Sequence, residues 1–307
     1  MMLGAGALAA LAAVIREGSF ERAARVLHVT PSAVSQRIKQ LEEQVGAILV
    51  VRASPCVATP VGEMVYRHAR QVELLETDLL ATLAPRASPG KGGTGSPAPP
   101  MRLAIAVNAD SLATWLMPAL AAFAAQHDAR VDVVLDDQDH TTQRLRSGRV
   151  LGAVTSQHRP VQGCRVHPLG VMRYLATASP RFARRWLPEG PTPAALAAAP
   201  TLAYDRRDRL CERFLGEQLD APDAELEPHY LPSPQAYVDA CRRGLGWGMN
   251  PELLMSRSAR RGRLVDLAPG CFIDVPLYWQ QWSLSSPSVD ALVAALGEHA
   301  RAELRAL

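Results

Sequence analysis

The sequence is poor in the features that mark a membrane protein or a disulfide-stabilised protein. No apolar run in its 307 residues approaches the roughly 20 residues that a transmembrane helix needs. The five cysteines are too widely spaced to form a Cys-x-x-Cys pair or a Cys/His cluster at zinc spacing. We therefore expect free thiols in a reducing compartment, with a redox switch as the minor alternative, and no metal site.

Catalytic signatures are also absent from the sequence. It contains no Gly-x-Ser-x-Gly elbow, no His-Glu-x-x-His motif, no Walker loop and no dinucleotide-binding glycine fingerprint, and its eight histidines are scattered. Catalysis needs a nucleophile with a base, or a metal constellation. The sequence therefore argues against an enzyme and predicts no cofactor.

Neither sign of charge is in large excess, because 33 Lys and Arg residues face 30 Asp and Glu residues, for a net charge of +3. This balance excludes a polybasic protein, but a DNA reader needs only a local basic patch. The apolar N-terminus lacks the basic segment and cleavage point of a signal peptide, and Leu8, Leu11 and Ile15 mark it as an amphipathic helix. We expect a cytoplasmic protein that does not enter a membrane.

Residues 19–46 carry the strongest pattern in the chain. Ser19 is a suitable N-cap for a short helix, and Thr30 followed by Pro31 places an N-cap and a first helical proline before a second one. Apolar residues at helical spacing give each helix one buried face. The two helices predict a helix-turn-helix, and the short strands that follow, up to residue 59, predict a wing.

The polar face of the second helix has the chemistry of a DNA reader. Hydroxyls, an amide and cations near a helix N-terminus can bond to base edges and phosphates, although a solvated helix pair in any small α domain would also present such a face. We expect Ser32, Ser35 and Gln36 to read bases, and the cations to hold phosphates or groove edges. The candidate DNA-binding residues are Thr30, Pro31, Ser32, Ser35, Gln36, Arg37, Lys39 and Arg52.

A long helix is predicted after the wing, from Thr59-Pro60 to about Leu83. Val65, Val72 and Leu79 repeat every seven residues along it. A long helix outside a compact domain needs a partner for such a stripe, so we expect a homodimer. A symmetric dimer presents two reading heads to an inverted-repeat operator in double-stranded DNA.

The segment AARVLHVTPSAVSQRIKQLEEQVG at 23–46 resembles, almost position by position, the winged helix-turn-helix of LysR-type transcriptional regulators. The resemblance implies an N-terminal all-α winged helix-turn-helix with a linker helix, plus a C-terminal α/β two-lobed, periplasmic-binding-protein-like effector domain. It also implies a homotetramer that acts with RNA polymerase. The expected domains are 1–59 (DNA-binding), 60–84 (linker helix for dimerisation), 85–100 (flexible Pro/Gly/Ser-rich hinge) and 101–307 (effector-binding).

From residue 101 onward, strand and helix patterns alternate, which predicts a parallel βαβ sheet. Buried strands are expected at 102–107, 131–136 and 151–155, and a second alternating set follows them. We therefore expect two α/β lobes joined by crossings near 159–163 and 264–267. Lobe I comprises 101–160 and 267–307, and lobe II comprises 163–264.

Ligands of such sheets bind beyond the carboxyl ends of parallel strands. Ser111 and the N–H groups of a helix start offer a site for a carboxylate, and aspartates on the neighbouring loops offer sites for ammonium groups. One anion site beside several carboxylates predicts a basic amino acid, although each aspartate taken alone is more typical of a helix cap or a surface turn. The candidate effector-binding residues are Asn108, Asp110, Ser111, Asp136, Thr155, Asp205, Ser233 and Met249.

The resemblance extends along nearly the whole chain. The strings IAVNADSLATWLMPAL, GAVTSQ and GLGWGM are similar to the LysG/ArgP-like subgroup of LysR-type regulators. This similarity implies an activator that senses lysine or arginine and promotes transcription of a basic-amino-acid exporter gene. Two alternatives stay open: a LysR-type regulator with a neutral or aromatic effector, and a two-lobed solute-binding protein or enzyme with an incidental helical head.

Overall fold

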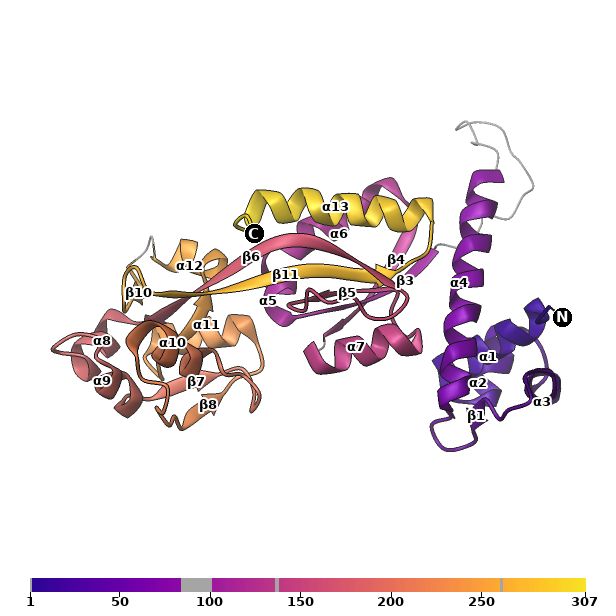
Figure 1. Ribbon diagram of the computed structural model, residues 1–307, viewed down its shortest axis with the longest axis horizontal. Coiled ribbons are helices and arrows are strands. Elements are labelled where there is room, and N and C mark those ends of the chain that lie inside the picture. Colours follow the sequence, from indigo (N-terminus) through magenta and orange to yellow (C-terminus); the bar gives the residue numbers. More distant parts are fainter. Residues whose placement is uncertain (1, 84–100, 136–137, 260–261) are drawn as a thin grey trace.

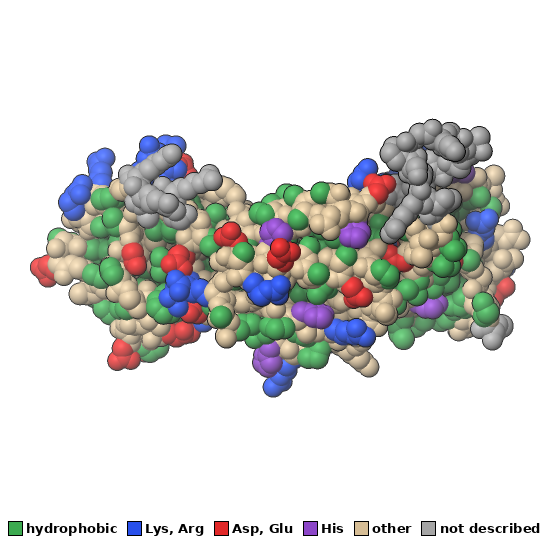
Figure 2. Space-filling model, turned by 90° about the horizontal axis from the view of Figure 1, so that it is seen from above, with side chains coloured by type: hydrophobic (Ala, Val, Ile, Leu, Met, Phe, Trp, Pro, Cys, Tyr) green, Lys and Arg blue, Asp and Glu red, His purple; other side chains and the backbone are tan. Residues whose placement is uncertain are grey.

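The computed structural model describes residues 2–83, 101–135, 138–259 and 262–307. A helical head, one long helix and a two-lobed α/β domain follow one another in an elongated molecule (Figure 1). Seen from above, its surface carries acidic and basic side chains scattered among uncharged ones rather than gathered in one patch (Figure 2). None of the described helices is long and apolar enough to cross a membrane.

The head has the winged helix-turn-helix architecture that the sequence predicts. Ser19 and Thr30 cap the second and third helices, and their hydroxyls accept the N–H groups of Arg22 (3.4 Å) and Ala33 (3.2 Å). Apolar side chains from the three helices form one buried cluster, and two short antiparallel strands form the wing. The elements are α1 (Ala5–Glu17), α2 (Phe20–Val26), α3 (Pro31–Val45), β1 (Val50–Val51) and β2 (Val57–Ala58).

The long helix α4 (Pro60–Leu83) forms over the range that the sequence predicts. Near its start, Gly62 packs so closely on the head that a Cβ there would lie 2.0 Å from the carbonyl oxygen of Leu49. Val65 and Val72 of the predicted repeat are half-buried, whereas another part of the helix surface is apolar and uncovered in the single chain. Its exposed large apolar residues are Val61, Met64, Leu75, Leu79, Leu80 and Leu83.

Lobe I contains the parallel βαβ unit that the alternating pattern predicts. Strand β3 is parallel to both β4 and β5, and the helices cover the two faces of the sheet (Figure 1). The helix expected after β3 includes one π-helical turn, η1. The elements are β3 (Met101–Val107), α5 (Ala109–Ser111), η1 (Leu112–Leu116), α6 (Met117–Gln126), β4 (Ala129–Leu135), α7 (Gln138–Ser147), β5 (Gly152–Thr155) and α13 (Pro287–Glu303).

The described residues of lobe II form short strands and five helices, and its buried side chains belong to the cluster shared with lobe I and to a smaller cluster of its own. Strands β7 and β8 are parallel, and β9 pairs antiparallel with a strand that comes from lobe I. The elements are α8 (Pro180–Trp186), α9 (Pro193–Ala198), β7 (Thr201–Ala203), α10 (Leu210–Leu219), β8 (Pro228–Tyr230), α11 (Pro234–Arg243), β9 (Gly248–Pro251), α12 (Glu252–Ala259) and β10 (Val265–Asp266).

A two-stranded antiparallel ribbon joins the lobes. It consists of β6 (Cys164–Ala178) and β11 (Phe272–Trp282), which stay paired from one lobe into the other (Figure 1). The sequence placed the crossings near 159–163 and 264–267, but the chain passes between the lobes inside these two strands. Near the middle of the ribbon, Gly170 and a register shift after Leu277 bend the strands without ending them.

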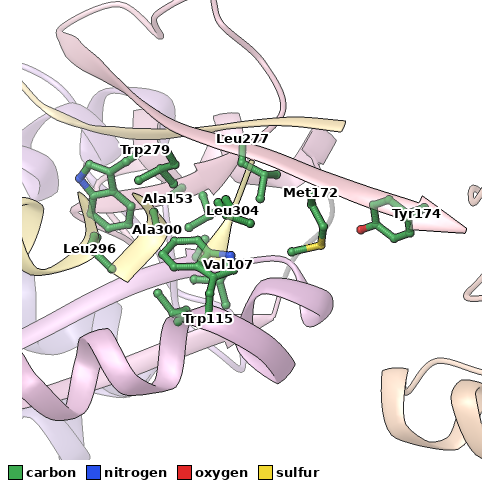
Figure 3. Packing of buried hydrophobic residues seen from close by; sticks show 14 of the residues in the cluster. Val107, Trp115, Ala153, Met172, Tyr174, Leu277, Trp279, Leu296, Ala300 and Leu304 are labelled. Carbon is green, nitrogen blue, oxygen red and sulfur yellow. The ribbon is translucent and has the colours of Figure 1, made fainter. Parts of the chain in front are cut away.

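The core of lobe I fixes the ribbon and the helices relative to each other. Trp115 and Trp279 are fully buried, and Leu296 and Ala300 of α13 pack around them (Figure 3). The packed side chains continue along β6 toward lobe II, where Tyr174 lies at the edge of the cluster. Because such interiors are close-packed, these side chains hold the ribbon strands against α13 and η1.

Candidate functional site

The third helix presents a polar face to solvent. Val34, Ile38 and Leu41 anchor α3 in the head and are fully buried, so the opposite side of the helix faces outward. That side carries the exposed side chains of Ser32 and Gln36. Neither side chain forms a hydrogen bond with another described residue, so the fold leaves both free to meet base edges.

The cations expected beside this face have neighbours of their own. The guanidinium of Arg37 lies against Gly6 at the start of α1, and that of Arg52 lies 4.9 Å from the ring centre of Phe20. Lys39 is exposed and its Nζ is 3.7 Å from a Glu43 carboxylate oxygen. These contacts hold the three cations at the rim of α3 and in the wing. Thr30 and Pro31 form the start of α3. Gln40, one turn beyond Gln36, is also exposed and extends the polar face beyond the residues that the sequence predicts.

A pocket of about 730 Å³ lies between the lobes. Its walls come from the loops after β3 and β5 in lobe I, the segment from Tyr204 to α10 in lobe II, and the middle of the ribbon. This is the position beyond the carboxyl ends of parallel strands where such sheets bind ligands. Four of the predicted effector-binding residues line it: Asn108, Asp110, Thr155 and Asp205.

Asp110 is the most strongly perturbed acid of the pocket. Burial of its carboxylate raises the pKa to about 6, although the hydroxyl of Tyr174 donates a hydrogen bond to Oδ2 (2.8 Å) and lowers the pKa in part. The negative charge of Asp208 raises the pKa of Asp110 further. This carboxylate therefore has one neutral donor and no positive partner among the described residues.

Asp208 approaches the same space from lobe II. Burial raises its pKa first of all, and the N–H groups of Tyr204 (2.8 Å) and Leu210 (3.0 Å) lower it by donating hydrogen bonds to the carboxylate. Asp205 stabilises the same turn, because its Oδ1 accepts the N–H groups of Arg207 (2.8 Å) and Asp208 (3.1 Å). Two acids from opposite lobes thus face one pocket and repel each other across it.

Two further polar atoms beside this pocket are unsatisfied. Asn108 Oδ1 and Ser111 Oγ are buried and have no hydrogen-bond partner within the described part of the chain. Asn108 lines the pocket, whereas Ser111 is fully buried behind the loop. Buried polar groups are normally paired, so an orphaned acceptor at a pocket wall points to a donor supplied by a ligand or by water.

The remaining predicted residues lie elsewhere. Ser233 caps α11 by accepting the N–H of Ala236 (3.4 Å), and Met249 is buried in β9 beside β6, so neither lines this pocket. Asp136 lies outside the described residues. So do the side chains of residues 137–140.

Sequence reasoning missed several lining residues. Tyr174 lies inside a strand, where no local motif marks it, and Asp208 lies three residues beyond the predicted Asp205. Two arginines of the lobe II wall, Arg209 and Arg213, were also missed; each pairs with an acid on α10, Glu212 or Glu217. The sequence signal that could have identified Asp208, Arg209 and Arg213 is the cluster of charged residues around the start of α10.

A head with a free reading face and a two-lobed domain with a pocket between its lobes define a ligand-responsive, DNA-binding transcriptional regulator. The chain belongs to the LysR family. Residues 6–63 match the model of the bacterial regulatory helix-turn-helix protein of the lysR family, and residues 98–301 match that of the LysR substrate binding domain.

Similar proteins within the family are known by name. The chain is 48% identical to the transcriptional regulator LysG of Mycobacterium tuberculosis over 92% of this chain and 88% of that protein. It is 41% identical to ArgP of Escherichia coli over 97% of both chains. Among solved structures, ArgP of Mycobacterium tuberculosis superposes with a TM-score of 0.86 at 44% identity over both whole chains. Full-length LysG of Corynebacterium glutamicum with bound effector Arg gives a TM-score of 0.78 at 38% identity, over 98% of this chain and 99% of that one.

Proposed function

We propose that the effector of this regulator is a basic amino acid, lysine or arginine, and that the regulator activates a gene for export of that amino acid. The observation that carries the proposal is the pair Asp110 and Asp208. These acids come from opposite lobes and face one pocket, and burial is the main cause that raises the pKa of each. The negative charge of Asp208 raises the pKa of Asp110 further. The similarity to LysG and ArgP, one of them solved with bound Arg, supports the same ligand class.

A cation between the two acids removes the repulsion and supplies the missing positive partner. The ligand then binds both lobes at once, so it favours the closed arrangement over the open one. A ligand shifts such an equilibrium only by its difference in affinity for the two states. A cationic side chain that bridges Asp110 and Asp208 provides that difference, because the bridge exists only when the lobes are close.

The other groups of the pocket suit the α-amino and α-carboxylate ends of an amino acid. Asn108 Oδ1 is an unpaired acceptor for an ammonium group. Arg209 and Arg213 of the lobe II wall, although each is paired with a glutamate, carry the guanidinium N–H donors that a carboxylate needs. We assign the predicted effector residues Asn108, Asp110, Thr155 and Asp205 to this site and add Asp208 and Tyr174. The protein binds the amino acid without changing it, and neither a metal nor a cofactor takes part.

DNA binding follows from the head and the long helix. Ser32, Ser35 and Gln36 of α3 read bases, while Lys39 and Arg52 hold phosphates. The exposed apolar face of α4 supports a homodimer, which pairs two heads on an inverted repeat, and two dimers form a tetramer that acts with RNA polymerase. Such a protein works where the chromosome lies, in the bacterial cytoplasm.

Calorimetric titration of the full-length protein with matched ligand pairs tests the effector class. Arginine is compared with citrulline, and lysine with norleucine, because each partner has nearly the same shape but lacks the side-chain charge. We expect arginine or lysine to bind and its neutral partner to bind at least about tenfold more weakly, as loss of one charge-assisted hydrogen bond predicts. Equal binding of citrulline and arginine would instead favour a neutral effector, and recovery of a modified ligand would indicate an enzyme.

A further inference from the structure

Helix α4 belongs to the head and to lobe I at the same time. Tyr66 and Ala69 are buried in the cluster of the head. Leu74, little more than one turn further on, is buried in the core cluster of lobe I. Close approach of the two bodies is visible at Gly148, where a Cβ would lie 2.6 Å from the Cα of Arg67. The helix is therefore a shared element rather than a free spacer.

Arg67 of α4 contacts the ribbon where β6 begins and where β11 ends. Its Nη2 donates to the carbonyl oxygen of Gly163 (2.8 Å), the residue before β6 begins. Its Nη1 lies 3.5 Å from the carbonyl oxygen of Gln162, and the guanidinium carbon lies 5.9 Å from the ring centre of Trp282, the last residue of β11. One side chain of α4 thus contacts the starting point of β6 and the end point of β11.

Asp78 makes the second contact, three turns along the same helix. It is 8% exposed, and its two carboxylate oxygens accept hydrogen bonds from the hydroxyls of Ser286 and Ser288, each at 2.5 Å. Ser286 also caps α13, the helix that follows β11. A buried carboxylate is tolerated only when such donors satisfy it, so this contact has a defined geometry and a large penalty for loss.

We propose that Arg67 and Asp78 are positioning residues that lock α4 onto lobe I and pass the state of the ribbon to the DNA-binding head. The ribbon strands run from the lock to the pocket, where β6 carries Tyr174 and β11 contributes Asp274 to the wall. A change in ribbon twist on lobe closure moves the strand ends that Arg67 holds. The transmission step rests on the proposed effector function, whereas the lock itself rests on geometry alone.

Hydrogen–deuterium exchange of the full-length protein without ligand tests the lock. The variants are Asp78→Asn, Ser288→Ala, which leaves the Ser286 cap intact, and Arg67→Gln. Matched controls on the same helix are Glu76→Gln and Arg70→Gln, whose side chains are exposed or paired with Glu73 of α4. We expect faster exchange in α4 and at the start of α13 for the lock variants only. Wild-type exchange in all three lock variants would overturn the lock.

The second measurement tests whether the lock transmits ligand binding to the DNA-binding head or only stabilises the structure. DNA is first selected by the wild-type protein from a random duplex pool, and its affinity is measured with and without arginine or lysine. Allosteric coupling is typically about 5- to 150-fold. In the lock variants we expect this coupling to collapse toward onefold while calorimetric ligand affinity stays at the wild-type value.

Different outcomes would overturn the lock, its positioning role and the proposed effector. Retained coupling in variants whose α4 exchanges faster would show that the lock is only structural and would overturn the positioning role. Absence of any basic-amino-acid binding by the wild type would overturn the proposed function and, with it, the transmission step, whereas the exchange measurement would still decide the lock.

Discussion

The pocket between the lobes and the contact between α4 and lobe I both enclose aspartates, but the surroundings of these acids differ. Asp78 receives a hydroxyl hydrogen bond on each carboxylate oxygen, so the fold itself satisfies it. Asp110 receives one hydroxyl and faces a second acid, and its pKa is raised to about 6. A satisfied buried acid is part of the architecture, whereas an acid that burial and repulsion leave strained is prepared for a partner from outside.

The first prediction separates the two acids by ligand affinity. Asp110→Asn removes the charge that a basic amino acid needs, and we expect it to weaken lysine or arginine binding by about 10- to 150-fold, the range for a hydrogen bond to a charged group. Asp208→Asn should act in the same direction. Calorimetry measures both, with the exposed acids Asp132 and Asp223, changed to Asn, as controls in lobes I and II. Wild-type affinity in Asp110→Asn would contradict the assignment of this acid.

The second prediction compares the two acids by their effect on stability, where we expect Asp78 to matter more than Asp110. Asp78→Asn should lower the free energy of unfolding by about 1–3 kcal/mol, because it leaves a buried contact with one acceptor too few, while ligand affinity is unchanged. Asp110→Asn should leave stability unchanged or increase it, since it removes a buried, repelled charge. Denaturant unfolding monitored by tryptophan fluorescence checks both variants. The comparison breaks if Asp110→Asn costs as much stability as Asp78→Asn.

The third prediction concerns pH. Because the pKa of Asp110 is about 6 in the empty pocket, protons compete with the cationic ligand below that value. Affinity should therefore fall by up to about tenfold per unit as pH drops below the pKa, while lysine and arginine stay cationic throughout. Asp110→Asn should lose this component of the pH dependence, whereas Asp132→Asn should keep the wild-type profile. A flat wild-type affinity between about pH 5 and 8 would exclude a titrating acid at the ligand.

The sign for stability is opposite to that for binding. The pKa of Asp110 is 3.8 when unperturbed and about 6 in the fold, so the folded state holds the proton more tightly. Ionisation of this acid therefore opposes folding as pH rises through 6, and the ligand relieves that penalty. We expect the stabilisation by lysine or arginine to be larger at neutral pH than below the pKa of Asp110, as thermal unfolding at several pH values would show.

The head was predictable from sequence because its signals are local. Ser19, Thr30 and Pro31 mark helix starts that depend on neighbours only three residues away, and the structure has those starts. The ribbon was not predictable in the same way. Strand β6 continues through Pro168 and Gly170 because β11 pairs with it from Cys164 to Leu175, and that partner lies about a hundred residues away in the sequence.

The pocket likewise contains residues that local sequence signals predict and residues that only the fold brings there. Asn108 and Asp110 directly follow a strand, so the rule for parallel sheets located them. Tyr174 lies within a strand and reaches Asp110 only through the bend of the ribbon. Ser233 carries the same sequence signal as a ligand-binding hydroxyl, yet its own helix uses it as a cap. Local patterns identify polar groups that need a partner, but only the fold determines whether the chain already supplies one.

The smallest predicted effect extends the comparison to the reading face of α3. The charge of Lys39 is partly compensated by Glu43, at 3.7 Å on the exposed side of the helix, whereas the Gln36 side chain has no hydrogen-bond partner among the described residues. Lys39→Ala should weaken binding to selected and random DNA alike and reduce the slope of log affinity against log salt by about 1. Gln36→Ala should lower affinity for selected DNA by about 1–3 kcal/mol and leave random DNA nearly unchanged. Salt-dependent DNA titrations with both duplexes check these outcomes. If Gln36→Ala weakened both duplexes equally, this residue would not read bases, and the free side chain would be only a solvated position on the helix.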